Sequence, residues 1–518
     1  MTSTREVLEL VPGKVSLSDL RRIYLGEVEL RLSASTRGVL AASQAAVQKM
    51  VDDGQVVYGI STGFGKLANT RIPADRLADL QRNLVLSHSA GTGTLLTDGV
   101  VRLVLATKAI SLSRGHSGVR PELVDVLLAL FNSNLLPHIP AKGSCGASGD
   151  LAPLAHLSCV LIGLGSVSAQ ARADVTTGRD AMRALGLQPL TLGPKEGLAL
   201  LNGTQVSTSL ALSGLFEAES VFSAGMMAGA LSLEAIKGSL KPFDERIQTA
   251  RGQAGQIAVA SAFRTMLDGS EIVSSHTECG RVQDPYSIRC MPQVMGACLD
   301  NLTHSARVLT IEANAASDNP LVFADTGEAI SGGNFHAEPV AFAADIIALA
   351  IAEIGAISER RLALLLDSTL SALPPFLIRD GGLNSGFMIA QVTAAALASE
   401  NKSHAHPASV DSLPTSANQE DHVSMATFAA RRLSEMANNT AVIVGIEAMA
   451  AVQGIEFLRP LRSSAIIESE ISVIREHVAF LESDRYMATD IETMRQWALR
   501  ANRTGEAHSL LPSVAQQS

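Results

Sequence analysis

Cysteine is scarce in this chain, and its few cysteines form no pattern typical of metal binding or of a disulfide framework. Five occur among 518 residues, so their number is odd. No two of them have the C-x-x-C spacing that marks zinc sites and redox motifs. We therefore expect a cytoplasmic location and no disulfide-stabilised fold. The five are Cys145, Cys159, Cys279, Cys290 and Cys298.

Positive charge is also in deficit, which argues against a nucleic-acid partner. The chain has 41 lysines and arginines against 51 aspartates and glutamates, so its formal net charge is −10. Binding to nucleic acid depends on clustered lysine and arginine. A small-molecule substrate is the better expectation.

Uninterrupted apolar runs of membrane-spanning length are missing as well. The stretch 337–366 is interrupted at helical spacing by Asp345, Glu353 and Arg360, whereas a spanning helix needs about 20 consecutive apolar residues. The first residues carry no apolar core of the kind found in a signal peptide. We therefore expect no membrane partner.

Alanine, leucine and other apolar residues are abundant, and they follow helical patterns. Hydrophobic residues make up 47% and charged residues 18% of the chain, which suits a large buried core. Four stretches are much longer than an average helix of about 12 residues, and their apolar surfaces are broad enough to be covered on two faces. They are 207–238, 292–315, 337–366 and 423–453.

These patterns predict a mainly α fold, with a long central helical bundle, a small mixed N-terminal region and an obligate oligomeric state. Residues 5–14 look strand-like, and residues 16–24 and 33–53 look helical. The expected divisions are an N-terminal region with the loop described next, the helical bundle and a C-terminal helical region, over residues 1–206, 207–455 and 456–518.

The most unusual segment is a loop of small residues that ends abruptly in a helix. From Gly143 to Gly149 almost no side chain has bulk, so the backbone can take positive φ and approach itself closely. Asp150 occupies the position of a helix N-cap, and Pro153 falls in the first turn. The loop is therefore predicted to end at the electropositive end of a helix.

Three residues of this loop, Ala147, Ser148 and Gly149, permit an uncommon reaction of the chain with itself. The unhindered Gly149 nitrogen can attack the Ala147 carbonyl carbon if the loop is bent tightly, and loss of water closes a five-membered ring. Loss of the Ser148 hydroxyl as a second water then leaves an exocyclic methylidene group. Such a group is an electrophile that forms without a metal or a bound coenzyme.

Other interpretations of the triplet are open on the residues alone. A small-residue loop before a helix is more often a simple turn or an anion-binding helix N-terminus. Ser148 is alternatively the nucleophile of a serine hydrolase, but the G-x-S-x-G pattern fails because Asp150 follows Gly149. A helical scaffold without catalytic activity is a further alternative.

Polar residues between the long helices gather in a few other loops. Loops on a rigid scaffold are where function concentrates, so these loops are candidates for a binding site. Two of the four tyrosines, Tyr58 and Tyr286, also lie in loops marked by glycine or proline. The polar loops cover residues 201–205, 283–289, 332–336 and 418–422.

With these loops, the chain closely resembles the ammonia-lyases that carry a self-made methylidene-imidazolone ring (MIO), and among them the members that act on histidine. The shared motifs follow one another along nearly the whole chain, which makes them far more specific than the triplet alone. Fumarase and aspartase are also helical lyases, but their Gly-Ser-Ser loop is absent here. The matching segments are 57–65, 80–91, 143–157, 195–205, 282–289, 331–340 and 406–425.

The resemblance implies that Ala147, Ser148 and Gly149 form the MIO ring and that no external cofactor is needed. The implied reaction is loss of ammonia from L-histidine, which gives trans-urocanate. By the same resemblance, Tyr58 is the base that removes the Cβ proton. Arg289 is the implied clamp for the substrate carboxylate, a role that suits a planar bidentate donor.

Four other residues receive supporting roles from the resemblance. Asn202 is expected beside the ring and the substrate amino group. Tyr286 and Gln283 are expected to support the ring or a proton relay, and Phe335 to shield the pocket from water. Four subunits join about the bundle in this family and several chains contribute to each active site, so a homotetramer is expected.

Two positions favour histidine over the aromatic amino acids as the substrate. Relatives that act on phenylalanine or tyrosine usually carry leucine in place of His88 and an amide in place of Glu420. Glu420 is expected to accept an imidazole N–H and to act as an acid/base group, while His88 holds the other side of the ring.

Four positions depart from the usual pattern of the family, although none has a catalytic role above. They leave open a rival in which the same ring re-adds ammonia at Cβ, as in 2,3-aminomutases of histidine or of aromatic amino acids. A tyrosine or phenylalanine ammonia-lyase is the other alternative. The departures are Ser61, Cys145, Leu164 and Met291.

His404 and His406 form an H-x-H pair, which is a weak indication of a metal site. No carboxylate or cysteine completes the pair at ligand spacing along the sequence. We therefore expect no metal.

Overall fold

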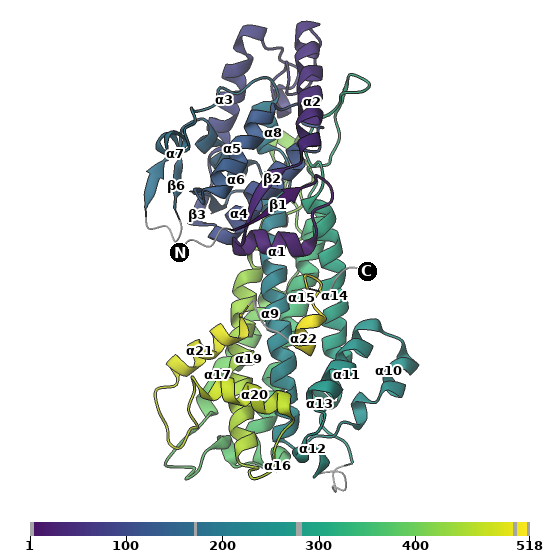
Figure 1. Cartoon of the computed structure of the whole chain (residues 1–518), viewed down its shortest axis with the longest axis vertical. Helices are drawn as coiled ribbons and strands as arrows, with labels where there is room; N and C mark the ends of the chain where they lie inside the picture. Colours follow the sequence, from purple (N-terminus) through teal and green to yellow (C-terminus); the bar gives the residue numbers. More distant parts are fainter. Residues whose placement is uncertain (1–4, 170–173, 276–281, 501–504, 515–518) are drawn as a thin grey trace. The chain divides into compact units, whose positions relative to one another are not determined.

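The computed structural model describes residues 5–169, 174–275, 282–500 and 505–514 (Figure 1). Cys279 lies outside the described residues, and the other four cysteines are free thiols. The chain forms two compact units, each assembled from three stretches. The first unit comprises residues 1–213, 306–345 and 407–431, and the second comprises 214–305, 346–406 and 432–518.

A small parallel sheet opens the first unit. Strand β1 (Glu6–Leu10) pairs with β2 (Val28–Leu32), and α1 (Leu17–Leu25) connects them. Ser16 begins α1 because its hydroxyl accepts a backbone N–H of the first turn. Helix α2 (Ala34–Asp52) follows. The predicted N-terminal strand and both predicted helices are confirmed.

The remaining strands of the first unit are short. The weakly patterned region after residue 165 contributes two of them and a helix, α7 (Gly178–Ala184). Strands of two to four residues carry too little alternation to be recognised in a sequence. The pairs are β3 (Thr92–Leu95) with β5 (Pro140–Lys142), β6 (Ser166–Ser168) with β4 (Leu136–Pro137) and with β7 (Val175–Thr177), and β8 (Leu321–Phe323) with β9 (Glu328–Ile330).

Five helices of the first unit include the one that directly follows the small-residue loop. Helices α3 (Leu77–His88), α6 (Leu151–Leu161) and α8 (Glu196–Leu201) pack against one another, and α4 (Asp98–Leu112) packs against α5 (Pro121–Asn132) (Figure 1). The last ten residues of α4 are all buried. A helix that is apolar on nearly every face belongs in a core, so this cluster gives the loop a rigid base.

The long helices confirm the predicted mainly α fold. Three of them have residues in both units, namely α9 (Gln205–Ala235), α14 (Met291–Ala313) and α15 (Glu338–Leu366). The fourth predicted stretch, 423–453, begins later than expected. Met425 has φ 54° and donates its N–H to the Cys145 carbonyl at 3.0 Å, so helical hydrogen bonding starts only beyond it.

Helix α19 (Leu433–Glu456) contributes most of its residues to the core of the second unit. It is buried along nearly its whole length and packs against α17 (Met388–His404) and α21 (Ala488–Ala498) (Figure 1). Arg361 of α15 donates to Glu447 of α19 at 2.8 Å, with both side chains fully buried. A paired buried charge of this kind is costly to break, because the partner is left without compensation.

Shorter helices complete both units. They are α10 (Glu245–Arg251), α11 (Ala254–Met266), α12 (Glu271–Ser274), α13 (Tyr286–Arg289), α16 (Ser368–Ser371), α18 (Ala426–Arg431), α20 (Ala465–Arg475) and α22 (Glu506–Ser509).

One helix among the described residues, α15, is long and apolar enough to cross a membrane. Two-thirds of its most apolar window, 67%, is buried inside the molecule. The core helix of a large helical fold has the same length and composition, so this property is weak evidence for a membrane span.

Candidate active site

The small-residue loop between β5 and α6 makes a tight turn at the predicted triplet. Ser148 has φ 54° and Gly149 has φ 80°, a left-handed conformation that is costly for residues other than glycine. The Gly149 N–H points back to the Gly146 carbonyl oxygen at 3.3 Å. The turn therefore has the bend that brings the backbone of the triplet close to itself.

Gly149 lies directly against Gly203, the residue that follows Asn202. A Cβ added at Gly149 would lie 2.3 Å from the Gly203 carbonyl oxygen, a distance that no side chain tolerates. The same oxygen accepts the Asp150 N–H at 2.8 Å. Glycine is thus required at position 149 both by its φ angle and by this contact.

Asp150 does not cap the helix that it precedes, contrary to the prediction from sequence. It occupies the N-cap position of α6 but makes no capping hydrogen bond there. Its fully buried carboxylate accepts the Ser207 N–H at 2.7 Å and the Thr427 hydroxyl at 2.7 Å. Ser207 lies in the first turn of α9, so Asp150 compensates the positive end of that helix instead.

Ser148 faces a pocket of about 630 Å³ in the first unit. The pocket is bounded by helices α3, α6 and α8, by the glycine loop after Tyr58 and by the loop that carries Glu420. Every lining residue belongs to the first unit. The lining includes the predicted site residues Tyr58, His88, Ser148, Asn202 and Glu420, together with apolar Phe64, Leu80, Leu84, Leu151 and Leu198.

Glu420 and Ser148 are in direct contact, although 272 positions separate them in the sequence. The Ser148 hydroxyl donates to Glu420 Oε1 at 2.8 Å. The other carboxylate oxygen accepts the hydroxyls of Thr415 at 2.8 Å and Ser416 at 2.5 Å. These two bonds fix the Glu420 side chain, so that Oε1 is directed at the triplet.

Tyr58 contributes a phenol oxygen to the same pocket. That oxygen accepts the Gly65 N–H at 3.2 Å, and the ring meets Phe64 edge-on with the centroids 6.4 Å apart. The glycine loop therefore orients the hydroxyl through its own backbone. A side chain positioned in this way is suited to proton transfer.

The hydrogen bonds of His88 define which ring nitrogen carries the hydrogen. Its Nδ1 lies 2.9 Å from the Leu84 carbonyl oxygen and 3.0 Å from the Ser87 hydroxyl oxygen. Because a carbonyl oxygen can only accept, Nδ1 is the protonated nitrogen of the neutral ring and Nε2 is an acceptor. In its neutral form, His88 therefore offers Nε2 as an acceptor in the pocket that it lines, a detail that the sequence did not reveal.

Asn202 is buried beside the turn. Its amide nitrogen donates to the Asn319 carbonyl at 3.3 Å. Its Oδ1 is also buried and has no hydrogen-bond partner among the described residues. A buried polar atom without a partner is costly, so this oxygen is suited to receive an N–H from a bound ligand.

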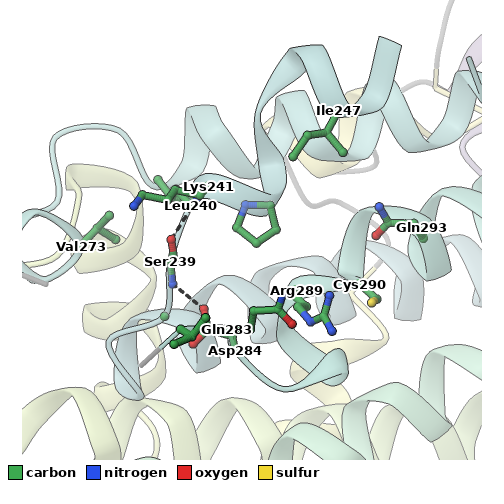
Figure 2. Close-up of a pocket in the computed structure, with 13 residues that line it drawn as sticks. Ser239, Leu240, Lys241, Ile247, Val273, Gln283, Asp284, Arg289, Cys290 and Gln293 are labelled. Atoms are coloured by element: carbon green, nitrogen blue, oxygen red, sulfur yellow. Dashed lines mark hydrogen bonds between the residues drawn. The ribbon is translucent and has the colours of Figure 1, made fainter. Parts of the chain in front are cut away.

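The predicted residues Gln283, Tyr286 and Arg289 belong to the second unit, where Gln283 and Arg289 line a different pocket of about 540 Å³ (Figure 2). The Arg289 guanidinium stacks on the Tyr286 ring at 4.4 Å. Within the described part of the chain, the buried Arg289 Nε has no hydrogen-bond partner. Tyr286 is 70% exposed, which leaves this segment accessible to another molecule.

Asp284 holds the loop that carries Gln283 and Arg289. Its carboxylate accepts the Ser239 N–H at 2.7 Å, the bond drawn in Figure 2. Asp284 itself is buried. The second pocket therefore has a fixed polar edge next to Arg289.

Phe335 lies in the loop between β9 and α15 and is half-buried. It is not among the residues that line the first-unit pocket. Nε2 of its neighbour His336 donates to the His422 carbonyl oxygen at 3.1 Å, and the two imidazole rings stack with their centroids 5.7 Å apart. This pair joins the loop of Phe335 to the loop of Glu420.

The structure places two carboxylates beside His404, which the spacing along the sequence did not indicate. Ligand atoms of Glu400, His404 and Glu435 lie within 4.8 Å of one another, whereas His406 is not in this group. Both glutamates are exposed, and Asn439 already donates to Glu400 at 3.1 Å. Glu400 and His404 lie one turn apart on α17, where an ion pair is common.

Comparison with known proteins gives a consistent result. The sequence model of the family described as "Aromatic amino acid lyase" matches residues 15–476. Histidine ammonia-lyase of Paracidovorax citrulli (strain AAC00-1) is 71% identical over 511 residues, which cover 99% of each chain.

Two solved structures share the fold. The crystal structure of histidine ammonia-lyase from Trypanosoma cruzi has a TM-score of 0.87 at 39% identity, covering 95% of this chain and 93% of that one. Tyrosine aminomutase from Streptomyces globisporus has a TM-score of 0.90 at 32% identity, covering 99% and 98%. The fold does not separate an ammonia-lyase from an aminomutase, because both structures have similar TM-scores. Sequence identity does, since the aminomutase is 32% identical to this chain and the histidine ammonia-lyase of Paracidovorax citrulli is 71% identical.

Proposed function

Because the chain belongs to the aromatic amino acid lyase family, we propose that it is a histidine ammonia-lyase, which eliminates ammonia from L-histidine and leaves trans-urocanate. One observation carries the proposal beyond the family. The pocket that holds Ser148 also holds His88 and Glu420, two polar side chains suited to the two nitrogens of an imidazole.

The triplet of Ala147, Ser148 and Gly149 fits the MIO ring of this family. The turn is tight at Ser148, and the Gly203 backbone leaves no room for a Cβ atom at position 149. Asn202 presents an unpartnered oxygen beside the same turn. When formed, the ring supplies an electrophile that makes ammonia easier to expel from an amino acid.

The chain's own residues bind the substrate and move its protons. Tyr58, held by the Gly65 N–H, takes the Cβ proton of the substrate. The unpartnered Oδ1 of Asn202 accepts an N–H of the substrate amino group. Arg289 binds the carboxylate through two parallel N–H groups.

The substrate imidazole lies between two acceptors in this proposal. Glu420 offers a carboxylate oxygen, and His88 offers Nε2 because its Nδ1–H is engaged by Leu84. A histidine side chain with hydrogen on both nitrogens satisfies both acceptors. A phenyl ring satisfies neither and leaves both polar groups unpaired in the occupied pocket.

Substrate discrimination follows from these two acceptors. A site built to hydrogen-bond its substrate rejects an analogue without the matching groups by on the order of 10⁴-fold, so we expect kcat/KM for histidine to exceed that for phenylalanine by about this factor. In His88→Leu, kcat/KM for histidine should fall by about 10- to 100-fold. Steady-state assays of urocanate and cinnamate formation measure both.

The matched control is His88→Gln, because the glutamine Oε1 offers an acceptor in place of Nε2. This variant should lose less activity than His88→Leu. Equal losses in the two variants would contradict the role of Nε2 as an acceptor.

Several copies of the chain share each active site in the proposed homotetramer. Two features support sharing: the first-unit pocket is lined by that unit alone, and the exposed Tyr286 lies beside Arg289 in the second unit. Exposed apolar side chains on α17, Ile389 and Val392, are 64% and 54% exposed and suit burial against another subunit.

Complementation tests the sharing directly. Ser148→Ala and Arg289→Ala should each be inactive alone, because each removes a part of every site. Co-expression of the two variants should restore a measurable fraction of wild-type activity in the mixed oligomers. If every site were complete within one chain, mixed oligomers would contain no intact site and would stay inactive.

The test of the function itself is addition of L-histidine to the purified protein, followed by ultraviolet absorbance of urocanate and chromatography of the products. A β-amino acid product would favour the aminomutase alternative, and turnover of tyrosine without histidine would overturn the substrate. A serine hydrolase would require labelling of Ser148 by a fluorophosphonate. Its hydroxyl instead donates to Glu420. We also propose a cytoplasmic location.

A further inference from the structure

A lysine is buried beneath the small-residue turn, on a helix whose pattern indicates nothing but core. Lys108 of α4 is 1% exposed. Its Nζ donates to the carbonyl oxygens of Ala199 at 3.0 Å and Asn202 at 2.8 Å. Both carbonyls lie at the C-terminal end of α8, where the last carbonyls of a helix have no partner within the helix.

The charge state of Lys108 agrees with this role. Burial lowers the pKa of the amine to about 7, although Asp318 and Asp150 act in the opposite direction. A neutral amine has two hydrogens to donate, and two carbonyls receive them. Lys108 therefore satisfies the end of α8 whether or not it is charged.

The end of α8 is in turn joined to the triplet. Asn202 is followed by Gly203, whose carbonyl accepts the Asp150 N–H at 2.8 Å. The Gly203 backbone also lies so close to Gly149 that no Cβ fits between them. A continuous set of contacts thus runs from Lys108 through Asn202 and Gly203 to the nitrogen-bearing residue of the turn.

Ring closure depends on the placement of that nitrogen. A bond forms between the Gly149 nitrogen and the Ala147 carbonyl carbon, and the carbonyl oxygen leaves as water with the amide hydrogens of Gly149 and Ser148. The Ser148 hydroxyl then leaves with its Cα hydrogen as a second water. The first step needs the nitrogen held against the carbonyl carbon, so a small displacement of Gly149 slows it.

We propose that Lys108 is a positioning residue for self-cyclisation, which holds Asn202 and Gly203 and thereby presses Gly149 into the reactive turn. This inference rests on the proposed function, because it concerns formation of the ring that the function requires. It does not place Lys108 in contact with the substrate.

The test measures the intact mass of the purified full-length protein over time, with circular dichroism as the measure of folding. Wild type should lack the mass of two water molecules. In folded Lys108→Met, two buried carbonyls lose their donor, and the mass deficit should appear about tenfold more slowly or more. Lys108→Arg, which keeps a donor, should recover most of the wild-type rate.

Thr107→Val is the matched control. Thr107 is the buried neighbour on α4, and its hydroxyl bonds only within that helix, to Leu103 at 2.7 Å. Its loss should lower stability slightly without changing the mass deficit. If Lys108→Met does not fold, the same mass measurement on Lys108→Gln and Lys108→Arg tests the positioning role.

The mass measurement separates failure of the positioning role of Lys108 from failure of the proposed function. A folded Lys108→Met or Lys108→Gln with the full deficit at the wild-type rate would overturn the positioning role. Wild-type protein at its full sequence mass would instead overturn the proposed ring, whatever the variants show. Activity is not needed for either conclusion.

Discussion

Replacing Ser148 with alanine is expected to abolish ammonia release from histidine. The variant has no side-chain oxygen to lose, so the methylidene group cannot form. Removing one member of a catalytic unit can cost on the order of 10⁴-fold or more in kcat, and we expect a loss of at least that size. The intact mass should at the same time regain most or all of the two missing water molecules. Urocanate absorbance and mass spectrometry measure the two effects on one sample.

Ser158→Ala is the matched control for this result. Ser158 lies on α6, ten residues after Ser148, and is buried in the same unit. Its hydroxyl donates to the Leu154 carbonyl oxygen at 2.7 Å. Its loss should leave the mass deficit intact and the turnover within a few-fold of wild type. Wild-type turnover by Ser148→Ala would refute the proposed electrophile.

Tyr58→Phe has the second-largest expected effect, and it should separate proton transfer from ring formation. General acid–base groups contribute about 10²- to 10⁴-fold, so kcat should fall within that range. The Tyr58 hydroxyl takes no part in closing the ring, and the mass deficit should therefore stay complete. A phenylalanine ring preserves the edge contact with Phe64, so folding should be unaffected.

Tyr24→Phe controls for the loss of a phenol hydroxyl elsewhere in the first unit. The Tyr24 oxygen accepts the Ser213 hydroxyl at 3.2 Å and is not among the residues that line the pocket. Turnover of histidine by Tyr24→Phe should stay close to that of the wild-type protein. If Tyr58→Phe retained full activity, another group would have to be the base.

The helices of this fold were predictable because their signal repeats every 3.6 residues over several turns. Helices α9, α14 and α15 begin and end within three residues of the predicted stretches. The short strands β6 and β7 were missed because three residues show no periodicity. Sequence patterns also divide a chain into consecutive pieces, whereas each unit here combines three separate stretches.

The candidate site shows the same limit at the level of single side chains. Motifs identified Ser148, His88 and Glu420, but the bond between Ser148 and Glu420 spans 272 positions and has no local signature. The sequence predicts Asp150 as the cap of its own helix, because it does not show that Ser207 is the partner of this carboxylate. Lys108 gave no signal, since one cation in an apolar helix looks like an exposed residue on its surface.

The hydrogen bond from Ser148 to Glu420 has a consequence for the order of events in the life of the protein. Before cyclisation, Glu420 Oε1 is occupied by a hydroxyl of the chain itself. Under the proposed function, that hydroxyl departs as water, and the carboxylate oxygen becomes available for an imidazole N–H. In a newly made chain, the Ser148 hydroxyl therefore competes with histidine for Glu420 Oε1. The affinity for histidine is acquired in the same event that creates the electrophile.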